Sequence, residues 1–191
     1  MPPKADQSLD ERILHAARTL WRSRGEAGLT LREVARKAGT TTTTVYKRFR
    51  DKEDLRTALA ERVRDELDAQ LFASTSMEDA YRRYLHFAET NPHEYELLRL
   101  NWTDVFRPDL PRPGRTWALQ QLARRFGGQP EDYSRFFYAL FLLVHGASTL
   151  LATARDRAAA TEARDQCLAV CDLLMRNPRS FAEPKTSPSS D

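Results

Sequence analysis

The side chains best suited to molecular recognition lie close together between residues 40 and 52. Residues 40–44 are five consecutive threonines, and a tyrosine and four cations follow them. The cations are Lys47, Arg48, Arg50 and Lys52. A threonine hydroxyl can hydrogen-bond to a base edge and its methyl can contact thymine, while lysine and arginine neutralise phosphates. The segment therefore has the chemistry for contact with nucleic acid, although each side chain taken singly is also an ordinary solvated surface group.

A short helix over about residues 41–48 would sort these side chains onto two sides. Val45 and Phe49 are four residues apart and would turn inward together. The threonine run also fits a β-prone or low-complexity segment, but its flanks favour a helix that one of the first threonines caps. The outward face would then carry Thr42, Thr43, Thr44, Tyr46 and Lys47, with Arg48 at its margin.

The flanking sequence predicts the elements that position this helix. Apolar residues recur every three or four positions from Leu9 to Trp21, and Gly25 can end that helix in a left-handed conformation. Thr30 opens Thr-Leu-Arg-Glu, a capping box that begins a second short helix, and Gly39 ends it. Two short helices joined by a tight glycine-containing turn are the helix-turn-helix arrangement. Asp51 then caps a long helix, and Lys52 lies in its first turn, where backbone amides also favour a phosphate.

The rest of the chain also has the periodicity of helices, so we expect an all-α protein of about nine helices. Three prolines between residues 108 and 113 require a loop there, and Pro130 suits the first turn of the next helix. We expect the last helix to open at Thr161 and to end near Arg176. The predicted organisation is a disordered start, a helix-turn-helix domain, a ligand-binding and dimerisation domain and a disordered tail. Their ranges are 1–8, 9–55, 56–176 and 177–191.

Composition and charge agree with a folded intracellular protein that has a basic N-terminal part. The 191 residues are 41% hydrophobic and 30% charged, which suffices for a core, and two cysteines cannot form a disulfide framework. Residues 1–60 hold 13 Lys and Arg against 8 Asp and Glu, whereas the remaining residues hold 17 against 19. This asymmetry suits a nucleic-acid-binding head on a neutral body, and we expect a cytoplasmic protein without a secretory signal.

The residues that most often carry catalysis or metals do not form a convincing site. His145 lies in the most apolar predicted helix, where it fits a core histidine or a polar group in a ligand pocket. Cys167 and Cys171 share one face of the last helix, where they fit core packing better than metal binding or redox sensing. We find no nucleophile elbow and no phosphate-binding glycine loop, so we expect neither an enzyme nor a cofactor or metal.

The uncharged stretch 136–154 fits either a membrane span or a buried helix. It contains a histidine and several hydroxyl groups, and no second such span exists, so the helix of a helical protein is the better interpretation. Such an apolar helix needs another apolar surface to cover it. We therefore expect residues 136–154 and 162–175 to form a four-helix bundle with a second copy of the chain. The expected interface residues are Phe141, Leu150, Leu168, Cys171 and Met175.

The block from Leu29 to Ala35, with Ala38-Gly39, Val45-Tyr46, Phe49 and residues 51–55, closely resembles the DNA-binding domain of the tetracycline-repressor-like (TetR) regulators. The spacing across about 50 residues is matched without an insertion. Thr40, Thr41 and Thr43 stand where the family often has other residues, which affects base preference rather than the fold. By this resemblance Thr30 and Arg32 contact DNA as well, and Tyr46 and Lys52 match family contact positions.

The second half resembles a C-terminal domain of that family named for its Trp-His-Gly motif. The matching residues are the segment 91–95 with Leu97 and Leu98, and Leu143-Val144-His145-Gly146, in which Val144 replaces the tryptophan. The resemblance implies a domain that dimerises through its last two helices and encloses a small-molecule pocket. Aromatic and polar side chains could line it, and the expected set is Tyr84, Trp102, Trp117, Tyr138, Phe141 and His145.

These observations favour a homodimeric repressor that binds palindromic double-stranded DNA and is released by a small, largely apolar effector. The alternative is a DNA-binding regulator without a small-molecule ligand, whose body contacts only proteins. A helical enzyme or carrier that has lost DNA binding fits less well, because the first third of the chain is basic and its turn is intact.

Overall fold

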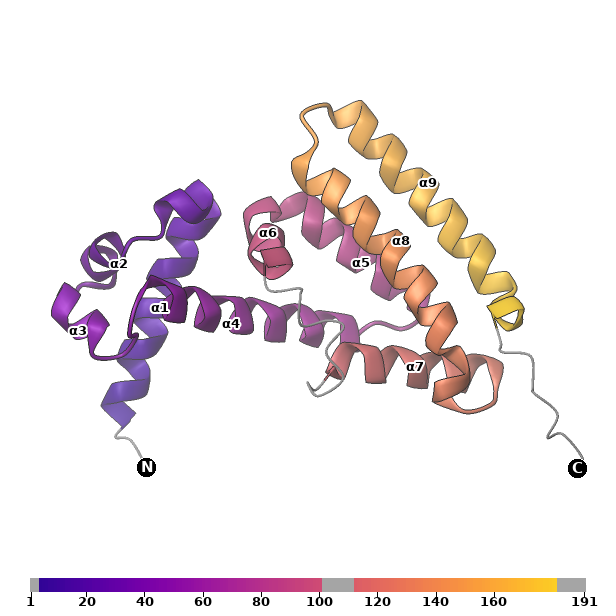
Figure 1. Cartoon of the computed structure of the whole chain (residues 1–191), viewed down its shortest axis with the longest axis horizontal. Coiled ribbons are helices and arrows are strands. Elements are labelled where there is room, and N and C mark those ends of the chain that lie inside the picture. The colour runs from indigo at the N-terminus through magenta and orange to yellow at the C-terminus, as the bar shows by residue number, and fades with distance from the viewer. Residues whose placement is uncertain (1–3, 101–111, 182–191) are drawn as a thin grey trace, which may run out of the picture. The chain divides into compact units, whose positions relative to one another are not determined.

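The computed structural model describes residues 4–100 and 112–181 (Figure 1). These residues form nine α-helices and three short 3₁₀ segments, and no β-strand occurs among them, which confirms the all-α prediction. The chain divides into two compact units. The first unit contains residues 1–67 and 90–109, and the second contains residues 68–89 and 110–191.

The helices follow one another along the chain. They are α1 (Lys4–Arg24), α2 (Leu31–Ala38), α3 (Thr42–Tyr46), α4 (Lys52–Phe72), α5 (Met77–Thr90), α6 (Pro92–Leu100), α7 (Pro113–Phe126), α8 (Ser134–Thr153) and α9 (Arg157–Arg176). The 3₁₀ segments are η1 (Gly25–Gly28), η3 (Pro130–Tyr133) and η4 (Pro178–Phe181). The unit boundary at residues 67–68 falls inside α4, whereas the sequence placed a domain boundary at residue 55.

Several element boundaries differ from the sequence prediction; one is that α7 begins at Pro113, the last of the three prolines assigned to a loop. The first helix begins at Lys4, although residues 1–8 were expected to be disordered; residues 1–3 lie outside the described range, as do residues 182–191 of the expected tail. The last helix begins four residues before Thr161, because Asp156 caps it by accepting a hydrogen bond from the amide of Ala158 at 2.9 Å. Pro130 begins a 3₁₀ turn, and α8 follows from Ser134.

The first unit is built around α1, which packs against α2 and α6. Its largest fully buried side chain is that of Trp21, and Ile13 and Leu20 are buried on the same helix. Val34 of α2 and Val45 of α3 are completely buried, and Leu31 and Ala35 of α2 are buried beside Val34, so each short helix has an apolar contact with the core. Since a helix of five to eight residues is not stable alone, burial of these side chains is what fixes α2 and α3.

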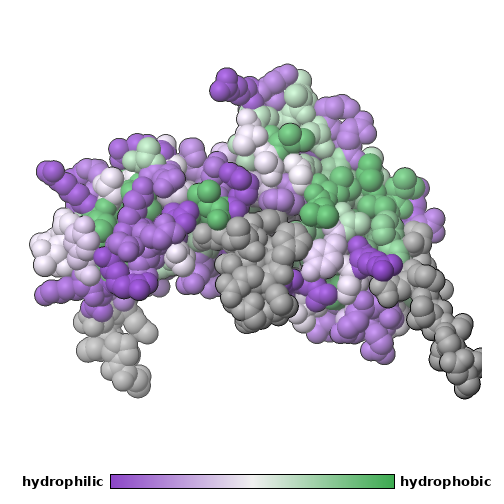
Figure 2. Space-filling view, viewed as in Figure 1, coloured by the Kyte–Doolittle hydropathy of each residue, from purple (hydrophilic) through white to green (hydrophobic). Residues whose placement is uncertain are grey.

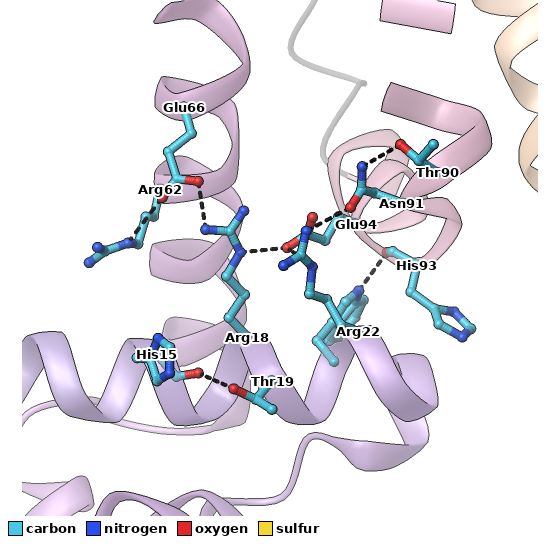
Figure 3. Close-up of polar contacts among 11 residues, drawn as sticks. His15, Arg18, Thr19, Arg22, Arg62, Glu66, Thr90, Asn91, His93 and Glu94 are labelled. Atoms are coloured by element: carbon cyan, nitrogen blue, oxygen red, sulfur yellow. Dashed lines mark hydrogen bonds and ion pairs between the residues drawn. The ribbon is translucent and has the colours of Figure 1, made fainter. Parts of the chain in front are cut away.

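A buried carboxylate joins α6 to α1 within the first unit (Figure 3). The side chain of Glu94 is only 1% exposed, and its Oε1 lies 2.5 Å from the Nε of Arg18 and 3.1 Å from the Nε of Arg22. Arg18 also pairs with Glu66 of α4 at 2.5 Å. Burial opposes the charge of Arg18, but the hydrogen bonds that it donates to both carboxylates outweigh this effect and raise the pKa of the guanidinium.

Hydrogen bonds to uncharged acceptors support the same junction. The indole Nε1 of Trp21 donates to the carbonyl of His93 at 2.5 Å, and Arg22 donates to the side-chain oxygen of Asn91 at 2.7 Å. The imidazole of His93 lies against Gly25, where a Cβ would come within 3.0 Å of its Nδ1. The first turn of α6 is therefore held against the C-terminal half of α1 by charge, hydrogen bonds and close contact.

The second unit has its own apolar core, formed by α5, α7, α8 and α9. Helices α8 and α9 lie side by side, as Figure 1 shows, and Phe136, Leu140 and Cys171 are buried between these elements. Tyr81 of α5 donates a hydrogen bond to Asp172 of α9. Burial, together with that carboxylate, raises the pKa of the Tyr81 hydroxyl, so the phenol stays neutral and holds the two helices together.

We predict that Glu94→Gln destabilises the protein by about 1.5–3 kcal/mol, because the amide cannot compensate the charges of two guanidiniums at a buried position. Urea denaturation of the full chain measures the change. The control is Glu96→Gln on the same helix, whose exposed ion pair with Arg99 contributes about 0.5 kcal/mol or less. Equal effects of the two substitutions would contradict the assigned importance of the buried carboxylate.

Candidate nucleic-acid interface

Helices α2 and α3 are joined by a tight turn that depends on a glycine. Gly39 has φ +66°, a left-handed conformation that favours glycine, and its amide hydrogen-bonds back into α2. The amide of Thr40 donates to the carbonyl of Ala35 at 3.0 Å and completes the end of the helix. Two residues after Gly39 the next cap begins, so the geometry is that of the predicted helix-turn-helix.

Each short helix has the threonine cap that the sequence predicted. The hydroxyl of Thr30 accepts a hydrogen bond from the amide of Glu33 at 3.2 Å, and that of Thr41 accepts one from the amide of Thr44 at 3.1 Å. The hydroxyl of Thr44 lies 2.8 Å from that of Thr41, so these two hydroxyls are occupied within the cap. Two members of the threonine run therefore serve the fold, and Thr44 is less suited to contact a base than the sequence suggested.

The exposed face of α3 is formed by residues spaced three and four apart. Thr43, Tyr46 and Lys47 are exposed, and Thr42 is half-buried beside them. Tyr46 is 56% exposed, which is unusual for a large aromatic ring with no partner helix on that side. This face presents a hydroxyl, a methyl, a phenol and an ammonium together, the set of groups that base edges and phosphates accept.

Some of the cations around α3 form ion pairs with neighbouring carboxylates, and others are exposed. Lys47 and Arg32 are exposed. Arg48 pairs with Asp10 of α1, with 3.6 Å between Nε and Oδ1, so it braces the domain rather than standing on the exposed face. Lys52 lies 3.5 Å from Oε1 of the exposed Glu26, a pair that a phosphate can displace because both groups are solvated.

Two further cations near the turn are neutralised locally. The guanidinium of Arg36 hydrogen-bonds to Glu33 at 2.8 Å and lowers the pKa of that carboxyl group. Asp54 accepts a hydrogen bond from the backbone amide of Arg50, and this contact, with the side chain of Arg50, lowers the pKa of Asp54. Both carboxylates therefore stay charged. The side chain of Arg50, which the sequence placed among the phosphate contacts, lies 3.5 Å from Asp54 but is 87% exposed, so a phosphate can displace this pair as well.

The residues expected to line a ligand pocket fall into two groups in the second unit. Tyr138, Phe141 and His145 share one face of α8, where the rings of Phe141 and His145 stack at 6.0 Å. Tyr84 instead packs against the core, and Trp117 contacts the ring of Phe72 at 5.8 Å. Trp102 lies outside the described residues. A separate open depression of about 290 Å³ is lined by the charged side chains of α5, α7 and α9, so it does not suit an apolar ligand.

The residues expected to form a dimer interface are also divided by the structure. Leu150 is 58% exposed, as an interface residue should be. Cys171 and Met175 are buried in the core of the second unit, with the thiols of Cys167 and Cys171 4.0 Å apart, and Leu168 packs against that core. Sequence analysis missed the other exposed apolar residues of these helices, which are Leu142, Val170 and Leu173. Figure 2 shows apolar surface over this part of the molecule.

The helix-turn-helix segment matches a known family. Residues 13–59, which include α2, the turn and α3, match the model of "Bacterial regulatory proteins, tetR family". A comparison with curated proteins gave no match.

Solved structures with the same fold cover nearly the whole chain. The transcriptional regulator SCO7222, a TetR from Streptomyces coelicolor, is 21% identical with a TM-score of 0.67, over 91% of this chain and 99% of that one. A TetR transcriptional regulator from Rhodococcus sp. RHA1 is 21% identical with a TM-score of 0.58, over 91% and 99%. A TetR-family regulator from Haemophilus influenzae is 19% identical with a TM-score of 0.55, over 87% and 98%. The chain thus has the fold of TetR transcriptional regulators, and its N-terminal part contains the helix-turn-helix domain of the tetR family.

Proposed function

We propose that this protein is a sequence-specific DNA-binding transcriptional regulator of the TetR family that acts in the cytoplasm. The observation that carries the proposal is the exposed face of α3, where Thr43, Tyr46 and Lys47 stand together on a helix fixed by its own cap. The family match over residues 13–59 supports it. In a helix-turn-helix, the second helix enters the major groove, and its N-terminal residues contact base edges.

The candidate residues divide by the part of DNA that they fit. Thr42 and Thr43 are in the first turn of α3 and fit base edges, while Tyr46 and Lys47 follow one turn later. Arg32 is exposed on α2, and Lys52 begins α4, which supports the proposal that both contact phosphates beside the groove. Thr30 caps α2 and is exposed, which fits a further contact with the DNA backbone.

We predict that Lys52→Ala weakens binding to all DNA sequences alike and lowers the salt slope by about one, because one phosphate contact is lost. Thr43→Ala should instead change preference at one base pair by about 1–3 kcal/mol. Competitive binding to a selected operator and to single-base variants at several salt concentrations separates the two effects. The control is Arg99→Ala, which removes a cation of α6 and should leave both quantities unchanged. Equal, sequence-independent losses from the first two variants would show that Thr43 contacts no base.

We further propose that the protein is a homodimer that binds a palindromic operator. Leu142 and Leu150 of α8 and Val170 and Leu173 of α9 are each more than 40% exposed, which is costly for side chains of this kind on neighbouring helices. Gly146 lies between the two leucines. Apart from its chain neighbours and the backbone of its own helix, no atom of the described residues lies within 4 Å of where its Cβ would be, so a partner helix could approach closely there. A two-fold axis through such a surface pairs two DNA-binding heads with two half-sites.

We predict that Leu150→Arg and Leu173→Arg each convert the dimer to a monomer, because a guanidinium would be buried against the apolar surface of the partner. Analytical ultracentrifugation measures the change, and circular dichroism checks that the helices persist. Leu100→Arg is the matched control, since Leu100 is an exposed leucine of α6 in the other unit. A dimer that survives both substitutions would place the interface elsewhere.

We also propose that an effector in the second unit releases the protein from DNA, as in a ligand-responsive repressor. The half-buried face of α8 that carries Tyr138, Phe141 and His145 supports this, as does the resemblance of the second half to the Trp-His-Gly domain. The chain passes between the units at residues 67–68, 89–90 and 109–110, and two of these crossings lie within α4 and α5. A shift of either helix would therefore be carried along the backbone to the unit that contains α3.

We predict that a small molecule that raises the melting temperature of the dimer also weakens operator affinity, by about 5–150-fold for a typical coupling. Fluorescence anisotropy with labelled operator, with and without the ligand, measures the effect. Linkage requires the operator to weaken ligand binding by the same factor. A bound ligand that leaves operator affinity unchanged would favour the alternative, a regulator that responds to no small molecule.

A further inference from the structure

Helix α8 has three distinct faces, one buried in the core, one exposed and one half-buried. Its core face carries Phe136, Leu140, Val144, Ala147 and Leu151, all buried. A second face carries the exposed residues Leu142, Gly146 and Leu150, at steps of four residues. The third face carries Ser134, Tyr138, Phe141 and His145, at steps of four, three and four residues. All four are half-buried, so this face is neither closed into the core nor fully solvated.

An arginine from α7 lies on this third face. Arg115 is half-buried, and its NH2 group donates to the hydroxyl of Ser134 at 3.1 Å. Its guanidinium stands over the ring of Tyr138, 5.9 Å from the centroid. Arg112 donates to the hydroxyl of the same tyrosine at 3.2 Å. Two guanidiniums thus converge on one phenol, next to the stacked rings of Phe141 and His145.

The charge of Arg115 has no partner of opposite sign among residues 4–100 and 112–181. Its described contacts are a hydroxyl and an aromatic ring, and its Nε is buried without a hydrogen-bond partner. By contrast, Arg125 on the same helix pairs with Glu78, with 2.7 Å between NH1 and Oε2. A partly desolvated guanidinium with an unused donor favours a planar anion, because a carboxylate accepts two parallel hydrogen bonds from it.

We propose that the effector is a small aromatic carboxylate that binds on the third face of α8. Arg115 binds the carboxylate, Ser134 and Tyr138 orient the guanidinium, and the rings of Phe141 and His145 contact the apolar part of the ligand. This assignment rests on the proposed ligand response and replaces the expected, largely apolar effector with an anionic one. The feature that selects an anion is Arg115, whose described contacts are both uncharged and whose buried Nε has no hydrogen-bond partner among the described residues.

The test compares carboxylates with their uncharged alcohols. Phenylacetate, 3-phenylpropanoate and 1-naphthoate are titrated into the full-length protein at constant ionic strength, alongside 2-phenylethanol, 3-phenylpropan-1-ol and 1-naphthylmethanol. Calorimetry and thermal shift measure binding. For at least one pair, the wild-type protein should bind the carboxylate at least about tenfold more tightly than the alcohol. Arg115→Met should remove that preference and leave alcohol binding unchanged.

Two further variants make the result specific. Arg124→Met makes the same substitution at an exposed position of α7 and should behave as the wild type. Arg115→Lys keeps the charge and loses the forked geometry, so it should retain only part of the preference for the carboxylate over the alcohol. It also serves as a control for a folding defect in the Arg115→Met variant. The proposal is overturned if no acid outcompetes its alcohol, if Arg115→Met keeps the preference, or if inorganic phosphate binds as tightly as the acids.

Operator binding distinguishes this site from the function on which it rests. If an acid binds through Arg115 and weakens operator affinity, both the site and the ligand response are supported. If it binds through Arg115 and operator affinity is unchanged, the anion site is supported and the proposed ligand response is wrong. If the protein binds no operator under any condition but binds the acid through Arg115, the site stands and DNA regulation is wrong.

Discussion

A carboxylate with almost none of its surface in water keeps its charge only where cations reach it. Glu94 is in this position, and its two guanidiniums both come from α1. The interaction connects residues 76 apart in the sequence and places α6 in the same unit as the helix-turn-helix. The helix-turn-helix part of the molecule is therefore not a free three-helix domain. Its first helix is held from one side by α2 and from the other by a helix that belongs, in sequence, to the body.

The two carboxylate oxygens of Glu94 differ in their contacts at the junction of α1 and α6. Oε1 of Glu94 contacts both arginines, whereas Oε2 has no hydrogen-bond partner among the described residues. An unsatisfied buried oxygen costs free energy, so the contact offers less net stability than its short distances suggest. Its contribution is specificity of position: α6 can dock on α1 only where Arg18, Arg22 and Trp21 meet its first turn.

Local chemistry explains which parts of the fold were predictable. Thr30, Thr41, Asp51 and the left-handed Gly39 act within three or four residues, so their roles follow from the sequence alone. Two ion pairs join distant segments of the chain: Arg18 with Glu94, and Arg48 with Asp10. No periodic pattern in the sequence predicts these pairs. The same limit applies to α8, which is apolar on most of its circumference. Periodicity cannot say which of its leucines face the core. On α9 it likewise cannot separate core from interface, and Cys171 and Met175 were assigned to an interface although they are buried.

Some residues of the threonine run stabilise α3 and others are exposed, and this difference affects how a binding preference can evolve. Thr41 and Thr44 bond to each other and to the backbone, and Val45 is buried, so substitutions there would disturb the fold of α3. Thr43, Tyr46 and Lys47 stand outside that framework, and exchanging them removes no internal contact of the helix. A descendant protein could therefore acquire a new operator through a few codon changes on one face of a five-residue helix, with little selection against them from loss of folding.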